Sequence, residues 1–204
     1  MSTSKKTHEG NFWDWFRKNE EKLFHLNIDS EQEREAVFDE LVQALAGVSP
    51  DLTFELGPEL EGKRELVLSA GGIKSAFPSV EALVQAAPSF SRWRFTKFRP
   101  RRAPIMQITL GEKTVSPEEV ECCILSNGSE LGLYLFFPDY VEEQRPIWGQ
   151  VGYLFLDEAL GEYDVEMKVG LIDFLPFDAH SDAVRFPLTE LSERFDKHYA
   201  ELQR

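Results

Sequence analysis

The sequence predicts an α+β fold with one or more mixed, mainly antiparallel sheets and helices packed on one side of them. Its strand patterns come in clusters with helical patterns between the clusters, which is typical of α+β proteins and not of a doubly wound parallel sheet. The dipeptide Asn127-Gly128 between two apolar runs predicts a β-hairpin. An apolar stripe at helical spacing from Ile147 to Ala159 leads into another apolar run, which predicts a helix that precedes a buried strand.

The first half of the chain opens with helical patterns and continues with strands. Phe12, Phe16 and Leu23 share one side of a helix that we expect to reach about Phe24. Ser30-Glu-Gln-Glu33 has the spacing of a capping box, which predicts the start of a second helix. The other elements expected here are strands over 52–56 and 65–69 with a turn at 57–62 between them, a helix that Pro88 ends, and a strand over 92–98.

The second half alternates strands and helices in a similar way, so the order allows two loosely similar halves. The elements expected are strands over 105–110, 120–125 and 130–137, a helix over 147–160, a strand over 169–175, a polar loop over 178–182 and a last helix that reaches Leu202. Gly161 stands where a helix C-terminus favours a left-handed residue, and Asp157 falls on the polar side of the helical pattern. The apolar side chains that we expect to be largely buried are Leu133, Leu135, Val151, Phe155, Leu171 and Ile172.

Length and composition indicate a globular protein. The chain has 204 residues, of which 42% are hydrophobic and 28% are charged. No apolar run approaches the ~18 residues of a membrane span, and no apolar segment of the secretory type follows the first basic residues. We expect a flexible tail over 1–10 and one α+β domain over 11–204, with a sub-domain boundary near 100–104. The adjacent Cys122 and Cys123 are poorly placed to bridge each other, which favours free thiols in the cytoplasm.

The charge of the chain is strongly negative but unevenly distributed. The net charge is −14, which disfavours nucleic-acid binding and favours a partner protein with a basic surface. One segment has the opposite sign and contains no acid; its basic residues are Arg92, Arg94, Lys97, Arg99, Arg101 and Arg102. Because aromatic residues alternate with these arginines, the segment is a candidate platform for an anion or for a single-stranded nucleic acid. The alternative is that the aromatic side chains belong to the core and the basic groups pair with the chain's own acids.

An acidic cluster and a short His-containing loop are the other candidate sites. The cluster consists of Asp157, Glu158, Glu162, Asp164 and Glu166. It is interpreted either as an exposed face or as a catalytic carboxylate pair or divalent-cation site. The loop Asp178-x-His180-x-Asp182 has metal-binding residue types, but two further ligands are not evident near it. No metal and no cofactor are therefore predicted.

Several motifs along the chain resemble those of a family of uncharacterised bacterial cytoplasmic proteins. They are Phe12-Trp-x-Trp-Phe16, Asn19-Glu20, Leu23-Phe24, Phe54-Glu55-x-Gly57, Phe77-Pro78, Leu83-Val84, Ala87-Pro88, Trp93, Phe98-Arg99-Pro100 and Leu156-Asp-Glu-Ala-Leu-Gly-Glu-Tyr-Asp-Val-Glu166. The resemblance covers most of the chain, and it implies a bacterial cytoplasmic setting but no activity.

Two functions are consistent with these observations as hypotheses. The first is a non-enzymatic cytoplasmic binding or regulatory protein that acts through a protein surface, for example by neutralising a basic toxin. The acidity of the chain and the scarcity of catalytic motifs favour it. The alternative is a domain, which could be an enzyme, that binds a small molecule or phosphate through the Arg94–Arg102 segment. The sequence indicates neither the oligomeric state nor the identity of the partner.

Overall fold

The computed structural model of the protein has the α+β fold that the sequence predicts. It describes residues 6–27, 30–111, 113–179 and 182–204. The chain divides into two compact units, Met1–Arg99 and Pro100–Arg204, at the start of the 100–104 stretch. Part of the expected tail lies outside the described residues, and residues 8–10 form the first turn of a helix. No helix in the described ranges is long and apolar enough to cross a membrane.

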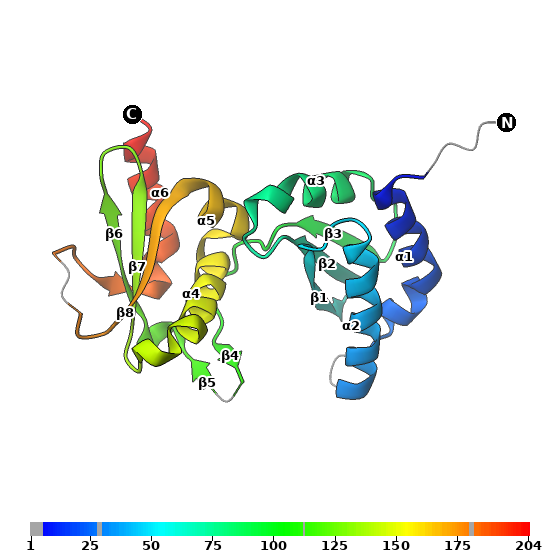
Figure 1. The fold of residues 1–204 in the computed structure, drawn as a ribbon, viewed down its shortest axis with the longest axis horizontal. Helices are drawn as coiled ribbons and strands as arrows, with labels where there is room; N and C mark the ends of the chain where they lie inside the picture. Colours follow the sequence, from blue (N-terminus) through cyan, green and yellow to red (C-terminus); the bar gives the residue numbers. More distant parts are fainter. Residues whose placement is uncertain (1–5, 28–29, 112, 180–181) are drawn as a thin grey trace. The chain divides into compact units, whose positions relative to one another are not determined.

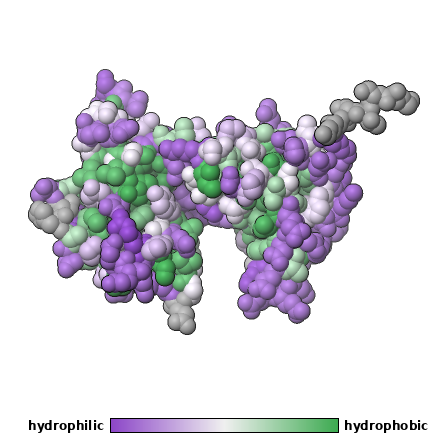
Figure 2. Space-filling view, in the orientation of Figure 1, coloured by the Kyte–Doolittle hydropathy of each residue, from purple (hydrophilic) through white to green (hydrophobic). Residues whose placement is uncertain are grey.

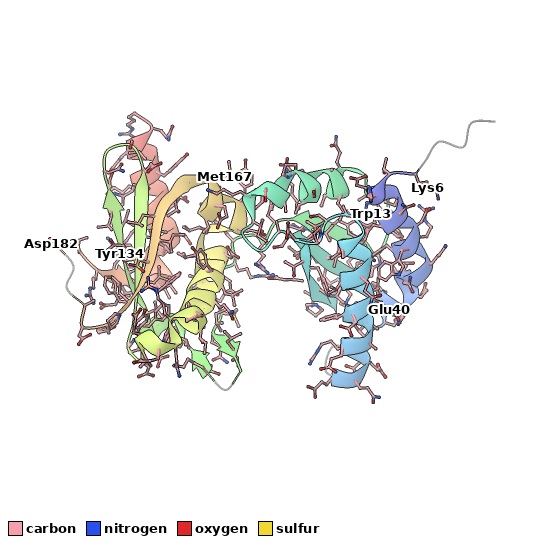
Figure 3. The ribbon with its side chains drawn as sticks, viewed as in Figure 1. Lys6, Trp13, Glu40, Tyr134, Met167 and Asp182 are labelled. Atoms are coloured by element: carbon pink, nitrogen blue, oxygen red, sulfur yellow. The ribbon has the colours of Figure 1, made fainter. Side chains whose placement is uncertain are left out.

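The first unit is a three-stranded sheet covered on one side by helices (Figure 1). Its elements are α1 (His8–Phe24), α2 (Glu31–Ala46), β1 (Thr53–Leu60), β2 (Lys63–Ser69), α3 (Phe77–Gln85) and β3 (Trp93–Lys97). The β2 strand pairs antiparallel with β1 and parallel with β3. The aromatic residues of α1 pack into this core, and the buried Trp13 (labelled in Figure 3) donates its indole N–H to the Leu83 carbonyl at 2.9 Å.

Two local predictions for the first unit were correct only in part. Ser30 is the N-cap of α2, so the helix begins where the pattern predicts, but the Ser30 side chain makes no capping hydrogen bond. The expected turn at Gly57-Pro58 lies inside β1, where the register with β2 shifts between Leu56 and Glu59. A proline is tolerated at such an irregularity because the ladder hydrogen bond is already interrupted. The chain instead turns at Glu61 and Gly62, which both have positive φ.

The second unit is built on a four-stranded sheet with the order β8-β7-β6-β9 and a separate two-stranded ribbon of β4 and β5. Its elements are β4 (Ile108–Leu110), β5 (Lys113–Val115), β6 (Glu121–Ser126), β7 (Leu131–Phe137), α4 (Arg145–Leu160), α5 (Glu162–Lys168), β8 (Val169–Pro176), β9 (Phe186–Pro187) and α6 (Leu191–Leu202). The predicted hairpin is present as the antiparallel pair β6–β7, and β8 lies parallel to β7. Helices α4 and α6 pack on one face of the sheet, where Leu133, Leu135 and Phe155 are fully buried.

The two units share one connection pattern. In each, an antiparallel strand pair is followed by a helical crossover to a third strand, which lies parallel to its neighbour. The crossover is α3 in the first unit and α4 with α5 in the second. The expectation of two loosely similar halves therefore agrees with the strand pairing.

Two burial predictions for the second unit were wrong. Leu171 is 52% exposed, because it pairs with Gly132 and points to the face turned away from α4 and α6. Its neighbour Ile172 pairs with Leu133 and packs against the core. Asp157 is buried, with 7% of its surface exposed, on a side of α4 that was expected to face solvent. The sequence patterns did not predict α5, which directly follows α4 and packs against it.

Candidate functional site

The basic segment is divided between the two units, and acids of the chain itself lie against it in both. In the first unit the Arg92 guanidinium donates to Glu20 at 2.8 Å and to Glu21 at 2.6 Å, and it lies 4.3 Å from the centroid of the Phe24 ring. The hydrogen bond with Glu21 raises the pKa of Arg92 and, in turn, lowers the pKa of Glu21. Arg92 therefore holds β3 against α1.

Three further basic side chains of the first unit also have acidic partners. Their ion pairs are Arg94–Glu65 at 3.4 Å, Lys97–Glu81 at 3.4 Å and Arg99–Glu55 at 2.8 Å. The Arg94 side chain is 75% exposed. These contacts agree with the interpretation in which the segment neutralises the chain's own acids.

Arg101 is the most extensively bonded residue of the segment. Its guanidinium donates to the Leu160 carbonyl at 2.7 Å, to Asp164 at 2.9 Å and to both carboxylate oxygens of Asp196 at 2.8 and 2.9 Å. The end of α4, α5 and α6 all present oxygen atoms to this guanidinium, which agrees with the alternative in which the basic groups pair with the chain's own acids. The backbone N–H of Arg102 donates to the Glu158 carbonyl at 2.7 Å.

The acidic cluster does not converge on one point. Asp157 and Glu162 are buried, while Asp164 pairs with Arg101 and with Lys168 at 2.8 Å. The Glu158 carboxylate accepts the backbone N–H of Met106 at 2.7 Å. Glu166 lies on α5, near enough to Tyr153 to help raise the pKa of that phenol, for which burial is the main cause. In the part of the chain that the structure describes, no group of three or more His, Cys, Asp or Glu side chains is arranged to hold a metal ion.

The two cysteines and the His-containing loop offer little geometry for catalysis. Cys122 and Cys123 are both free and fully buried. Burial raises the pKa of the Cys122 thiol well above its ordinary value, which keeps it in the unreactive protonated form. His180 lies outside the described residues.

A different feature stands out, which is the face of the four-stranded sheet turned away from α4 and α6, called here the outer face. Its side chains are Glu121, Cys123 and Leu125 from β6, Gly132, Tyr134 and Phe136 from β7, and Leu171, Asp173 and Leu175 from β8. Both charged members are paired, Glu121 with Arg185 at 3.7 Å and Asp173 with Arg145 at 2.7 Å.

Apolar side chains of the outer face reach solvent. Leu171 is 52% exposed, and Phe177, just beyond β8, is 41% exposed. Figure 2 shows apolar residues gathering over the strands of the second unit. The Arg185 guanidinium lies 3.6 Å from the centroid of the Phe136 ring and covers part of this surface. Most residues of the outer face are nonetheless apolar, whereas a sheet face in contact with solvent is usually polar.

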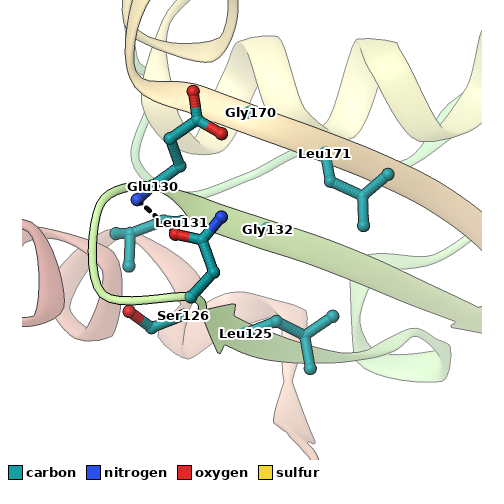
Figure 4. Close-up of a pocket in the computed structure, with 8 residues that line it drawn as sticks. Leu125, Ser126, Glu130, Leu131, Gly132, Gly170 and Leu171 are labelled. Atoms are coloured by element: carbon teal, nitrogen blue, oxygen red, sulfur yellow. Dashed lines mark hydrogen bonds between the residues drawn. The ribbon is translucent and has the colours of Figure 1, made fainter.

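A cavity of 180 Å³ opens at the hairpin end of the outer face (Figure 4). It is lined by Leu125, Ser126, Asn127, Glu130, Leu131, Gly132, Gly170 and Leu171. The missing side chain of Gly132 creates the space, because this residue pairs with Leu125 on one side and Leu171 on the other. A Cβ atom at Gly132 would lie 3.4 Å from the Leu171 Cβ and 3.5 Å from the Leu125 Cβ.

Glu130 lies at the rim of this cavity and is fixed by the turn. The Asn127 side-chain oxygen accepts the backbone N–H groups of Ser129 at 2.9 Å and Glu130 at 2.8 Å. The Glu130 carboxylate lies against Gly170, where a Cβ atom would be only 2.8 Å from its Oε2. Among the described residues, no basic side chain pairs with this carboxylate.

The net charge of the protein is concentrated in the unit that carries this face. Residues 100–204 include 20 acidic and 9 basic residues, a net charge of −11, and residues 1–99 include 16 and 13, a net charge of −3. The unit that carries the outer face therefore also carries most of the negative charge of the chain. The sequence pattern did not predict this face, because the adjacent Leu171 and Ile172 were both expected to be buried.

Comparison with models of known protein families, with curated proteins and with solved structures finds no match. The resemblance to a bacterial family stays a prediction, so only the geometry and charge of the chain itself can indicate its function.

Proposed function

We propose that this chain is a binding or regulatory protein and that its partner is a protein that docks on the outer face of the second unit. The observation that carries the proposal is the exposure of Leu171 on the outer face and of Phe177 just beyond β8; in the described part of the second unit, α4 and α6 pack against the other face. Exposed apolar side chains on one face are typical of interaction sites, because their burial against a partner is favourable. This proposal continues the leading hypothesis from the sequence and names the surface through which the protein would act.

The charge of the second unit supports a basic partner. With a net charge of −11 on residues 100–204, an approaching basic protein gains long-range attraction, whereas an acidic one is repelled. The apolar side chains would supply affinity and the surrounding acids would supply association rate and selectivity. A partner that presents apolar side chains flanked by lysine or arginine fits both properties.

The alternative function, an anion or phosphate site in the Arg94–Arg102 segment, has weaker support. The arginines that would bind the anion already contact carboxylates, as Arg99 does with Glu55 and Arg101 with Asp164 and Asp196. An anion would have to displace these partners and leave their charges exposed. The contacts of the segment therefore fit a structural role better than a role in ligand binding.

The docking proposal is tested with a random peptide library selected on the immobilised protein. We expect the selected peptides to be rich in basic and apolar residues. Each of the changes Leu171→Ser and Phe177→Ser should weaken their binding about tenfold or more, because burial of one such side chain is worth about 1.5–3 kcal/mol. Thermal stability should change little, since both side chains are partly exposed in the free protein.

Leu60→Ser is the matched control for this experiment. Leu60 is also an exposed apolar side chain, 67% exposed, but it lies at the end of β1 in the first unit. The control variant should bind the selected peptides like wild type. Peptides that bind the Leu171→Ser and Phe177→Ser variants as tightly as wild type, or a selection that yields acidic peptides, would contradict the proposal.

A further inference from the structure

We infer that the cavity at Gly132 is an anchor pocket for a single aliphatic side chain of a partner polypeptide, and that Glu130 at its rim pairs with a lysine or arginine next to that side chain. The inference rests on the proposed function and specifies the chemistry of the segment that docks. It commits to an extended peptide segment in which an aliphatic residue and a basic residue are neighbours.

The size and lining of the cavity fit one apolar side chain. An apolar protein cavity of about 150 Å³ is known to accept benzene, so a volume of 180 Å³ is sufficient for one leucine, isoleucine or methionine side chain. Its apolar walls are the side chains of Leu125 and Leu171, its floor is the backbone of Leu131 and Gly132, and its polar lining comes from the turn that holds Asn127 and Glu130 (Figure 4). A group that enters between these walls exchanges water for apolar contact on several sides.

Gly132 is not required by its backbone conformation. It does not adopt the positive φ that favours glycine, and it lies in β7, where a β-branched residue is normally preferred. Glycine within a strand forgoes packing, and it often marks a place where another molecule approaches the backbone closely. The missing side chain here has a visible consequence, which is the cavity itself.

A β-bulge next to Gly132 positions the Glu130 carboxylate at the rim of the cavity. The β8 strand has one extra residue, Gly170, because Val169 pairs with Leu131 and Leu171 pairs with Gly132. Without a Cβ atom at Gly170, the Glu130 carboxylate can lie directly over the strand, where any other residue would approach its Oε2 to 2.8 Å. Bulges commonly redirect a side chain at a functional site in this way.

The backbone of the rim is held in place, and the Glu130 carboxylate has no basic partner among the residues that the structure describes. The Asn127 side chain holds the turn through its hydrogen bonds to the backbone N–H groups of Ser129 and Glu130. A carboxylate in this position forms a charge-assisted hydrogen bond with an incoming ammonium or guanidinium group. The outer face therefore has a cavity for an aliphatic side chain next to a carboxylate that can pair with a basic residue.

The probe for this inference is the capped peptide Ser-Gly-Leu-Lys-Gly-Ser, titrated into isotope-labelled protein and followed by NMR. We expect saturable shifts of the amide signals of Gly132, Gly170 and Leu171. Replacing the leucine of the probe by alanine should weaken binding about tenfold, because most of the apolar contact is lost. Replacing its lysine by glutamate should weaken binding several-fold.

Variants of the protein test the same two contacts, the apolar anchor and the ion pair with Glu130. Gly132→Val fills the cavity and should abolish binding while the thermal midpoint stays at or above that of wild type; Gly132→Ala is the milder version should the valine variant fail to fold. Gly149→Ala, on α4, is the matched control, since its Cβ would lie 3.9 Å from the Phe174 ring and far from the cavity lining. Glu130→Gln should remove the preference for the lysine probe over the glutamate probe.

The outcomes separate this inference from the proposed function. If Gly132→Val binds the probe like wild type, or if the leucine probe does not bind wild type at its highest soluble concentration, the anchor pocket is refuted. If Phe177→Ser loses the library-selected peptides while Gly132→Val retains them, the outer face still binds a partner but the cavity takes no part. If neither change affects those peptides, both proposals fail.

Discussion

Replacing Arg101 by glutamine should destabilise the second unit, because the Arg101 side chain is bonded to three of its helices. In the structure its guanidinium connects the Leu160 carbonyl at the end of α4 with Asp164 on α5 and Asp196 on α6. Glutamine is too short and has no charge to make these contacts together. Three helices therefore lose a common partner in one substitution.

The magnitude can be worked out from the individual contacts. The hydrogen bond to the Leu160 carbonyl, at 2.7 Å, is worth about 1 kcal/mol, and it also satisfies a backbone group at a helix C-terminus. Each carboxylate contact contributes about 0.5 kcal/mol, because both lie near solvent and the side chain of Asp196 is 58% exposed. We expect Arg101→Gln to lower the free energy of unfolding of the second unit by about 2 kcal/mol at neutral pH.

The effect should depend on pH in a defined direction. Hydrogen bonding to Arg101 is the main cause that lowers the pKa of Asp196 in the folded protein. A carboxylate with a lowered folded pKa stabilises the protein above its unfolded pKa, about 3.9 for aspartate, and loses that contribution as the pH falls through the folded pKa. The difference between wild type and Arg101→Gln should therefore be constant near neutral pH and shrink below about pH 4.

Urea denaturation at a series of pH values measures this difference, and Arg94→Gln is its control. Arg94 has one ion pair at 3.4 Å and a side chain that is 75% exposed, so its substitution should change the free energy of unfolding by less than about 0.5 kcal/mol. Equal effects of the two substitutions at neutral pH would show that Arg101 is only a surface charge. A difference that persists unchanged to low pH would show that the carboxylates are not the reason.

Two further predictions concern the core of the second unit. Gly152→Ala should lower the free energy of unfolding of this unit by about 1–3 kcal/mol, because the new Cβ would lie 2.0 Å from the buried Phe174 ring. Gly149→Ala on the same helix should be neutral or stabilising. Equal effects of the two substitutions in urea denaturation would contradict this prediction. Cys122 and Cys123 should both react with an alkylating agent in the unfolded, unreduced protein and resist it in the folded one, and a mass that rises only after reduction would reveal a disulfide instead.

The fold was predictable wherever a local pattern had only one structural solution. Asn127-Gly128 located the β6–β7 hairpin, although the connection has four residues instead of two. The apolar stripe of α4 and its end at Gly161 were also correct. The α5 helix was missed because its seven residues carry too few apolar positions to show a helical period.

The candidate site was not predictable because it depends on pairing across strands. The alternation in β8 shows that Leu171 and Ile172 point to opposite faces, but only the register decides which face α4 and α6 cover. Similarly, nothing in the sequence shows that Gly132 stands between Leu125 and Leu171, since these residues belong to three strands. The signal that was available is modest: two glycines, Gly132 and Gly170, in otherwise apolar runs.

The basic segment shows why a cluster in sequence need not be a cluster in function. Its residues are adjacent along the chain, yet the division between Arg99 and Pro100 assigns them to two separate units. Arg99 pairs with Glu55 in the first unit, whereas Arg101 pairs with Asp164 and Asp196 in the second. Each unit thus uses its share of the segment to neutralise acids that its own fold brings together. The negative charge of the second unit is left largely uncompensated by this arrangement, and that excess is the property a basic partner would recognise.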